Sequence, residues 1–138
     1  MYEKIMVPVD LAHVDRLEKA LTTAADLAKH YRIPICYVGV TASLPGAVAH
    51  TPAEFARKLE QFGAAQASKY SLDNIETKAI TSHDPAVDLD DNLLKAIANT
   101  GADLVVMASH VPELADHIFA SNAGYVASYA KISVLVVR

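Results

Sequence analysis

The chain has 138 residues, of which 52% are hydrophobic and 20% are charged, a balance typical of a globular domain and not of a disordered chain. Its formal net charge of -4 argues against a general affinity for nucleic acid or for anionic membranes. Pro45 and Gly46 interrupt the longest apolar region, so no stretch approaches a membrane span. We therefore expect a single domain over residues 1–138, without a signal peptide, in a soluble cytoplasmic protein.

Strand and helix patterns alternate from the N-terminus onward. A short apolar run over residues 5–9 predicts a buried strand that ends at Asp10. Apolar residues at helical spacing then predict an amphipathic helix from about Val14 to Tyr31. A second buried strand over residues 35–40 contains the lone Cys36, which we interpret as a buried structural thiol.

A loop over residues 41–50 precedes a clear helix start. Thr51 suits the capping position, Pro52 suits the first helical position, and Glu54 follows. The loop is apolar for its size, which leaves two interpretations open: a lid over a ligand site, or a packing surface between subunits. The residues that this second helix is expected to bury are Phe55, Leu59, Phe62 and Ala65.

The third strand, residues 74–81, is half polar, which is typical of a strand at the edge of a sheet. Asp84 and Pro85 open a third helix, and Gly101 ends it. The expected core face of this helix consists of Leu93, Leu94, Ile97 and Ala98.

A buried strand over residues 104–107, a helix from Ser121 to about Ala130 and a strand over residues 134–137 complete the chain. Helical crossovers between apolar strands imply an α/β fold, with a parallel sheet and helices on both faces. Ligands of such sheets bind beyond the carboxyl ends of the strands, where the strand order reverses. The candidate lining residues are Asp10, Val40, Thr41 and residues 108–112.

The last strand reaches the C-terminus without polar alternation. An open apolar edge is an aggregation hazard unless it pairs with another strand. Antiparallel pairing with the same strand of a second copy would form a twofold homodimer. Whether such dimers pair into a tetramer, and which other proteins bind, is left open. The predicted dimer interface is formed by Val134, Leu135, Val136 and Val137.

No constellation in the chain predicts a catalytic or metal site. None of the six histidines has ligand spacing together with a carboxylate partner, so no metal is expected. Ser109 and Ser121 lack the His–Asp partners of an activated nucleophile. Asp10 is either a hydrogen-bond partner of a bound adenine or ribose or a cap for the following helix, and its place at the carboxyl edge favours the first interpretation.

Three segments resemble the strands of one known family, the universal stress proteins. Residues 4–10 are similar to its opening strand, residues 101–107 to its fourth-strand signature and residues 133–138 to its closing strand. The resemblance covers the whole chain and is closest to the F-type branch. Further segments shared with that branch are Ser43-Leu44-Pro45, Ala108-Ser109-His110-x-Pro112 and Ser121-Asn122-Ala123.

The resemblance implies a five-stranded parallel sheet in the order 3-2-1-4-5, as in adenine nucleotide alpha-hydrolase-like folds, and a homodimer joined through the last strand. It implies ATP, with Mg, or AMP as a ligand that is not rapidly turned over. Because no residue is identified as a base or a water-orienting group, slow ATP hydrolysis is the most that we expect. By position, the nucleotide-binding residues would be Pro8, Val9, Asp10, Val40, Met107, Ala108, Ser109, His110, Val111, Ala120, Ser121 and Asn122.

The chain departs from the family's nucleotide-binding pattern, G-x2-G-x9-G followed by Ser or Thr. Ala108, Val111 and Ala120 replace the three glycines, and the interval before the third is one residue short. A β-branched residue such as Val111 resists the positive φ that glycine adopts freely. Two hypotheses follow: a stress-response module that binds an adenine nucleotide, and a dimer that binds none and acts through protein partners.

Overall fold

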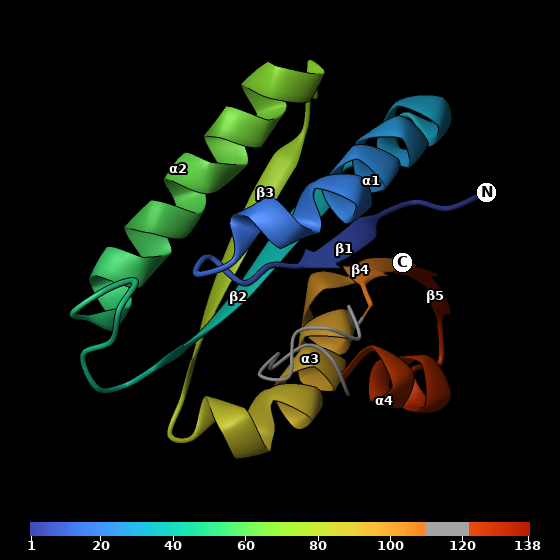
Figure 1. The fold of residues 1–138 in the computed structure, drawn as a ribbon. Helices are drawn as coiled ribbons and strands as arrows, with labels where there is room; N and C mark the ends of the chain where they lie inside the picture. Colours follow the sequence, from blue (N-terminus) through green and yellow to red (C-terminus); the bar gives the residue numbers. More distant parts are fainter. Residues whose placement is uncertain (110–121) are drawn as a thin grey trace.

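The computed structural model describes residues 1–109 and 122–138 (Figure 1). Within these ranges, strands and helices alternate as the sequence predicts. The strands are β1 (Ile5–Pro8), β2 (Ile35–Ala42), β3 (Ile75–Ser82), β4 (Leu104–Ala108) and β5 (Ser133–Val137). The helices are α1 (Glu18–Tyr31), which follows a 3₁₀ turn η1 (Val14–Leu17), then α2 (Pro52–Tyr70), α3 (Pro85–Thr100) and α4 (Asn122–Tyr129).

The five strands form one parallel sheet in the order β3-β2-β1-β4-β5, which confirms the predicted fold and strand order. The central strand β1 pairs through Ile5 with Ile35 of β2 on one side and with Leu104 of β4 on the other. The chain order therefore reverses between β1 and β4, and β3 and β5 are the two edges. In Figure 1 the pairs α1/α2 and α3/α4 lie on opposite sides of this sheet.

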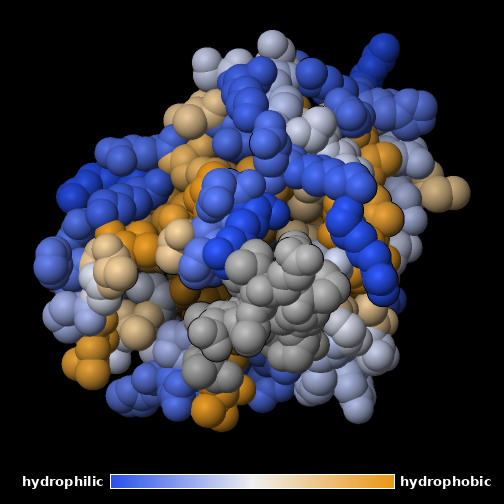
Figure 2. All heavy atoms as spheres, viewed as in Figure 1, coloured by the Kyte–Doolittle hydropathy of each residue, from blue (hydrophilic) through white to orange (hydrophobic). Residues whose placement is uncertain are grey.

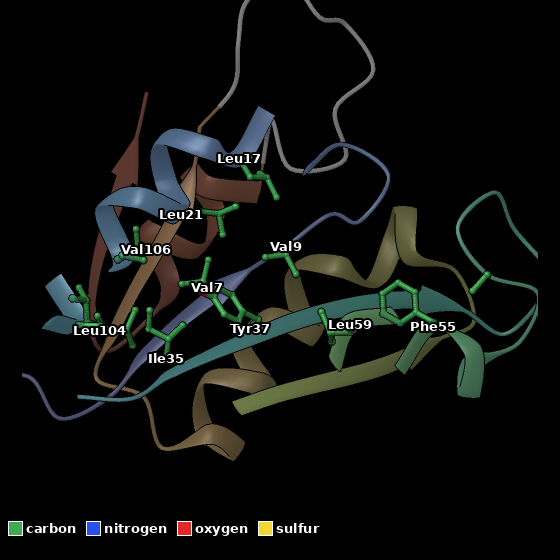
Figure 3. Packing of buried hydrophobic residues seen from close by; sticks show 14 residues of the cluster. Val7, Val9, Leu17, Leu21, Ile35, Tyr37, Phe55, Leu59, Leu104 and Val106 are labelled. Carbon is green, nitrogen blue, oxygen red and sulfur yellow. The ribbon is translucent and has the colours of Figure 1, made fainter. Parts of the chain in front are cut away.

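Side chains alternate between two apolar layers along the inner strands, because successive residues of a strand point to opposite faces. Ile5 and Val7 of β1 pack in the layer beneath α1 and α2, whereas Met6 packs in the layer beneath α3 and α4. Figure 3 shows the first layer, with Leu59 of α2 against β2. Each fully buried Val, Leu or Ile contributes roughly 1.5–3 kcal/mol to folding, so both layers are needed for stability.

Local signals at several positions have the expected outcome. Thr51 caps α2 by accepting a hydrogen bond from the Glu54 N–H at 3.1 Å. Gly101 ends α3 in the left-handed conformation, with a φ of 73°, which glycine adopts without strain. Cys36 is buried, and that burial raises the pKa of its thiol. None of the helices in the described ranges is both long and apolar enough to cross a bilayer.

Two of the sequence-based element boundaries need correction. The first helical segment begins as the 3₁₀ turn η1, and α1 itself begins only at Glu18, because no side chain caps either start. Strand β2 is longer than predicted and extends to Ala42, since it pairs with β3 along its whole length, up to the pair of Ala42 with Ser82.

Two predicted core residues, Ala65 and Ala98, are exposed. In α2 the buried positions are instead Gly63 and Gln66, because the helix approaches β3 closely there. A Cβ on Gly63 would lie 2.8 Å from Cγ2 of Thr77, so the line of closest contact passes through Gly63 rather than Ala65. In α3, Ala96 is buried and Ala98 is exposed, so the face that packs on the core also differs from the predicted one.

Candidate functional site

A cavity of about 240 Å³ lies beyond the carboxyl ends of β1 and β2. Its walls come from five parts of the chain: the segment after β1, the end of β2, the loop that follows β2, the first turns of α2 and the first turns of α3. The lining residues are Val9, Asp10, Leu11, Ala12, Val40, Thr41, Ala42, Leu44, Gly46, Ala47, Val48, Ala49, Phe55, Pro85 and Leu89. This is the edge of the sheet at which parallel α/β folds bind ligands.

The loop over residues 43–50 is attached to the start of α2. The His50 N–H donates a hydrogen bond to Oε2 of Glu54 at 3.0 Å, and Nζ of Lys58 donates to the carbonyl oxygen of Val48. Lys58 also forms an ion pair with Oε1 of Glu54 at 3.3 Å. These bonds hold the loop in place as a wall of the cavity.

The charge state of Glu54 supports this attachment. The hydrogen bond from the His50 N–H, followed by the contact with Lys58, lowers the pKa of the Glu54 carboxyl below its usual value. The carboxylate is therefore ionised near neutral pH, which is the form that accepts both bonds. The loop therefore lines the cavity, and both of its interpretations, a lid over a ligand site and a packing surface between subunits, stay predictions.

Asp10 both lines the cavity and caps the turn that follows β1. Its Oδ1 accepts a hydrogen bond from the Ala12 N–H at 3.0 Å, and its Oδ2 lies 2.8 Å from Nδ1 of His13. The carboxylate therefore stabilises the turn before the first helical segment and does not cap η1 or α1, so the interpretation of Asp10 as a helix cap is wrong. Its place on the wall also keeps it within reach of a ligand, so the two roles are compatible.

Phe55 forms the end of the cavity next to β2, and the strand has a glycine at the point of contact. A Cβ on Gly39 would lie 2.8 Å from Cζ and 2.9 Å from Cε1 of the Phe55 ring. The ring is only 3% exposed, so it has little room to withdraw (Figure 3). The size of the cavity at this end therefore depends on the absence of a side chain at Gly39.

The structure brings together only some of the predicted nucleotide-binding residues. Val9, Asp10 and Val40 line the cavity, whereas Pro8 and Met107–Ser109 are not among its lining residues. His110, Val111, Ala120 and Ser121 lie outside the described residues, and Asn122 is the first residue of α4.

The backbone of Ser109 has a structural role that the sequence did not indicate. Its N–H donates to the carbonyl oxygen of Val137 at 2.8 Å, which continues the pairing of β4 with β5 by one residue. This N–H is therefore engaged in the sheet and is not directed at a phosphate.

Sequence reasoning missed several of the wall residues. Phe55 was predicted as a core residue, Pro85 was predicted only as part of a helix start, and no prediction was made for Leu89. The apolar character of residues 43–50 was the one signal for this wall, because small apolar side chains in a surface loop need a reason to be there.

Electrostatically the cavity is mostly neutral. Among the described residues that line it, Asp10 carries the only charged side chain. The first turns of the adjoining helix α3 carry Asp88, Asp90 and Asp91, and burial, together with the neighbouring Asp91, raises the pKa of Asp90. No group of three metal-ligating side chains gathers anywhere in the described ranges.

A second hollow, of about 320 Å³, lies at the opposite edge of the sheet, where α1 and α2 end. Its charged lining residues Lys29, Arg32 and Asp73 are exposed. Ligands of parallel α/β sheets bind beyond the carboxyl ends of the strands, and this second hollow lies at their amino ends. The cavity beside Asp10 is therefore the better candidate site.

Comparison with known families gives one match along the whole chain. The family model of the universal stress protein family matches residues 1–138. A curated relative from Shigella flexneri, named universal stress protein G, is 29% identical over 146 residues, and the match covers 100% of each chain. The G-type name supports the family as a whole, and the resemblance to the F-type branch stays a prediction.

Solved structures of universal stress proteins share the fold. One from Archaeoglobus fulgidus is 22% identical with a TM-score of 0.71, covering 100% of both chains. Another from the same organism, in complex with dAMP, is 21% identical with a TM-score of 0.69, covering 99% of this chain and 98% of that one. A third, in complex with cAMP, is 18% identical with a TM-score of 0.70 and covers 99% and 97%.

Proposed function

The chain belongs to the universal stress protein family, and from this premise we propose that it is a stress-response regulatory module that binds an adenine nucleotide without rapid turnover. The proposed site lies at the carboxyl ends of strands 1, 2 and 4. The observation that carries the proposal is the cavity in which Asp10 after β1 and Val40 of β2 come together.

The chemistry of the cavity supports an adenine ligand. A planar, weakly polar base suits walls made of aliphatic side chains and the Phe55 ring, with Asp10 and Thr41 as polar groups at the side. The volume of about 240 Å³ is below the range of about 300–1,000 Å³ for sites that enclose a whole drug-sized ligand, so it fits a base and sugar better than a complete nucleotide. The relatives in complex with dAMP and cAMP add support by analogy.

Filling the cavity tests this proposal. The melting temperature of the native protein is measured at increasing concentrations of adenosine, AMP and ATP-Mg. A ligand at about a hundred times its Kd stabilises the folded protein by about 2.7 kcal/mol. We expect a saturable rise, and we expect Ala42→Trp to abolish it because the indole would occupy the cavity. The matched control is Ala65→Trp on the exposed face of α2, which should keep the rise. No rise with any adenine compound at millimolar concentration would refute the proposal.

We also propose that the molecule is a homodimer joined through the last strand. The strand β5 is an edge of the sheet, and it pairs with β4 on one side only within the described residues. Leu135 is 39% exposed on this strand, although Val134 and Val136 pack against the core. A second copy of β5 would cover that side chain and pair the open edge.

Sedimentation velocity tests the dimer. We expect a dimer for the native chain and a monomer for Leu135→Lys, because the substitution places a charge in the strand-to-strand contact. Val87→Lys is the control, since Val87 is 73% exposed on α3 and away from β5. A native monomer at micromolar concentration would contradict the proposal. A dimer that binds no adenine compound would favour the alternative function, a module that acts through protein–protein interaction.

A further inference from the structure

The cavity beside Asp10 has no described side chain that could neutralise a phosphate. The carboxylate of Asp10 is the one charge on its described walls, and it is already bonded to the Ala12 N–H and to Nδ1 of His13. A phosphate placed next to this carboxylate would meet a charge of the same sign. Phosphate sites in proteins are normally built with the opposite charge or with free N–H groups.

The positive charge of Lys58, on the outer side of the loop, is already paired with Glu54. It borders an adjoining hollow that shares Leu11, Ala12 and Val48 with the cavity. Its ammonium group is bonded to the carbonyl oxygen of Val48 and lies 3.3 Å from Oε1 of Glu54. Turning Lys58 toward a ligand would break the attachment of the loop that forms the wall.

The segments around the cavity add negative rather than positive charge. Pro85 and Leu89 of α3 line it, and the same helix carries Asp84 at its start and Asp88 and Asp90 in its first turns. One carboxylate oxygen of Asp90 is buried without a hydrogen-bond partner among the described atoms.

The amino-acid sequence extends this pattern. No Lys or Arg occurs between Lys95 and Lys131, the stretch that includes the predicted nucleotide-binding residues from Met107 to Asn122. The N–H of Ser109, one of the predicted nucleotide-binding residues, is bonded within the sheet. The side chains and backbone groups that the structure describes around the cavity therefore do not favour a chain of phosphates.

From these observations we infer that the site recognises the nucleoside and not the phosphates, so that its ligand class is an adenine nucleoside or its monoester. This inference rests on the proposed function. Adenine and ribose contact the apolar walls and the side chain of Asp10, and each added phosphate contributes no affinity. Neutral adenosine binds at least as tightly as AMP, and ATP binds more weakly than both.

Titration calorimetry of the native protein with adenosine, AMP and magnesium-free ATP tests this order. We expect the Kd values of adenosine and AMP to agree within about threefold and the Kd of ATP to be about tenfold higher or more, a difference of 1.4 kcal/mol. The adenosine affinity should not change with salt, because no ion pair is involved. Tighter binding of AMP or ATP than of adenosine would overturn the inference and leave the proposed function intact. Binding of none of the three would refute both.

A charge added at the rim gives an independent test. Ala12 is exposed and borders both hollows, so Ala12→Lys would add an ammonium group at the rim of the cavity. We expect this variant to gain about tenfold in affinity for ATP relative to adenosine, and to lose the gain in high salt. Ala12→Gln is the control for size and should leave the ratio unchanged. A ratio that Ala12→Lys does not move, while adenosine still binds, would refute the charge argument.

Discussion

Replacing Leu59 with alanine is expected to lower the free energy of unfolding by about 2–5 kcal/mol, the largest effect of any single change considered for this chain. Leu59 is fully buried between α2 and β2, where its Cδ2 would lie 3.4 Å from a Cβ on Gly39. Removing the isobutyl group takes apolar area out of the layer beneath α1 and α2 and leaves a void that the packed neighbours cannot close. Denaturation in urea, followed by circular dichroism, measures the loss.

The same substitution at Leu44 is a matched control. Leu44 is 76% exposed on the loop after β2, so Leu44→Ala should change the free energy of unfolding by no more than about 0.5 kcal/mol. On the face shown in Figure 2, hydrophobic residues form separate groups among hydrophilic ones. An exposed side chain such as Leu44 buries little apolar area, so its truncation removes little stabilisation. Equal losses for Leu59→Ala and Leu44→Ala would mean that α2 does not pack on the sheet as described.

Gly39→Ala is expected to lower the free energy of unfolding by about 1–3 kcal/mol and to weaken adenosine binding as well. The new methyl group would lie within 2.9 Å of two ring carbons of Phe55, so the ring must shift. Since Phe55 forms the end wall of the cavity, a displaced ring reduces the room for the base. Urea denaturation and adenosine calorimetry on the same variant measure both effects.

Two further variants separate this mechanism from a general effect of losing a glycine. Gly46→Ala is the control, because a Cβ on Gly46 meets no atom within 4 Å, and its stability should match or slightly exceed that of the native chain. Phe55→Leu should partly rescue Gly39→Ala, giving a coupling free energy of about 0.5–3 kcal/mol in a double-mutant cycle. Additive effects would show that the ring and the strand do not meet at this point.

Several features of the fold follow from short stretches of sequence. The buried strands over residues 5–9 and 104–107 are apolar throughout, and this pattern predicts them without reference to the rest of the chain. The start of α2 depends on Thr51 and Pro52, and the end of α3 on Gly101, because caps act within one turn. Such local signals explain why the order of elements was predicted well.

Which face of a helix contacts the sheet is not decided by the sequence of that helix alone. Ala65 and Ala98 fit the apolar spacing of their helices but are exposed. The contact face of α2 is decided by how closely its Gly63 can approach Thr77 of β3, a residue of another element. Helical periodicity therefore identifies an apolar stripe but not the line along which it touches its neighbour.

The sequence by itself determined the α/β class, the succession of strands and helices and the edge of the sheet at which a ligand should bind, because periodicity, caps and the geometry of parallel strands act locally. Only the tertiary structure decided the walls of the cavity. The contact of Phe55 with Gly39 and the bond of the Ser109 N–H to Val137 join different elements that meet only when the chain folds. The attachment of residues 43–50 to Glu54 and Lys58 is local in sequence, but it forms a wall only because α2 packs beside the end of β2. These contacts depend on how elements pack, which no short pattern of residues specifies.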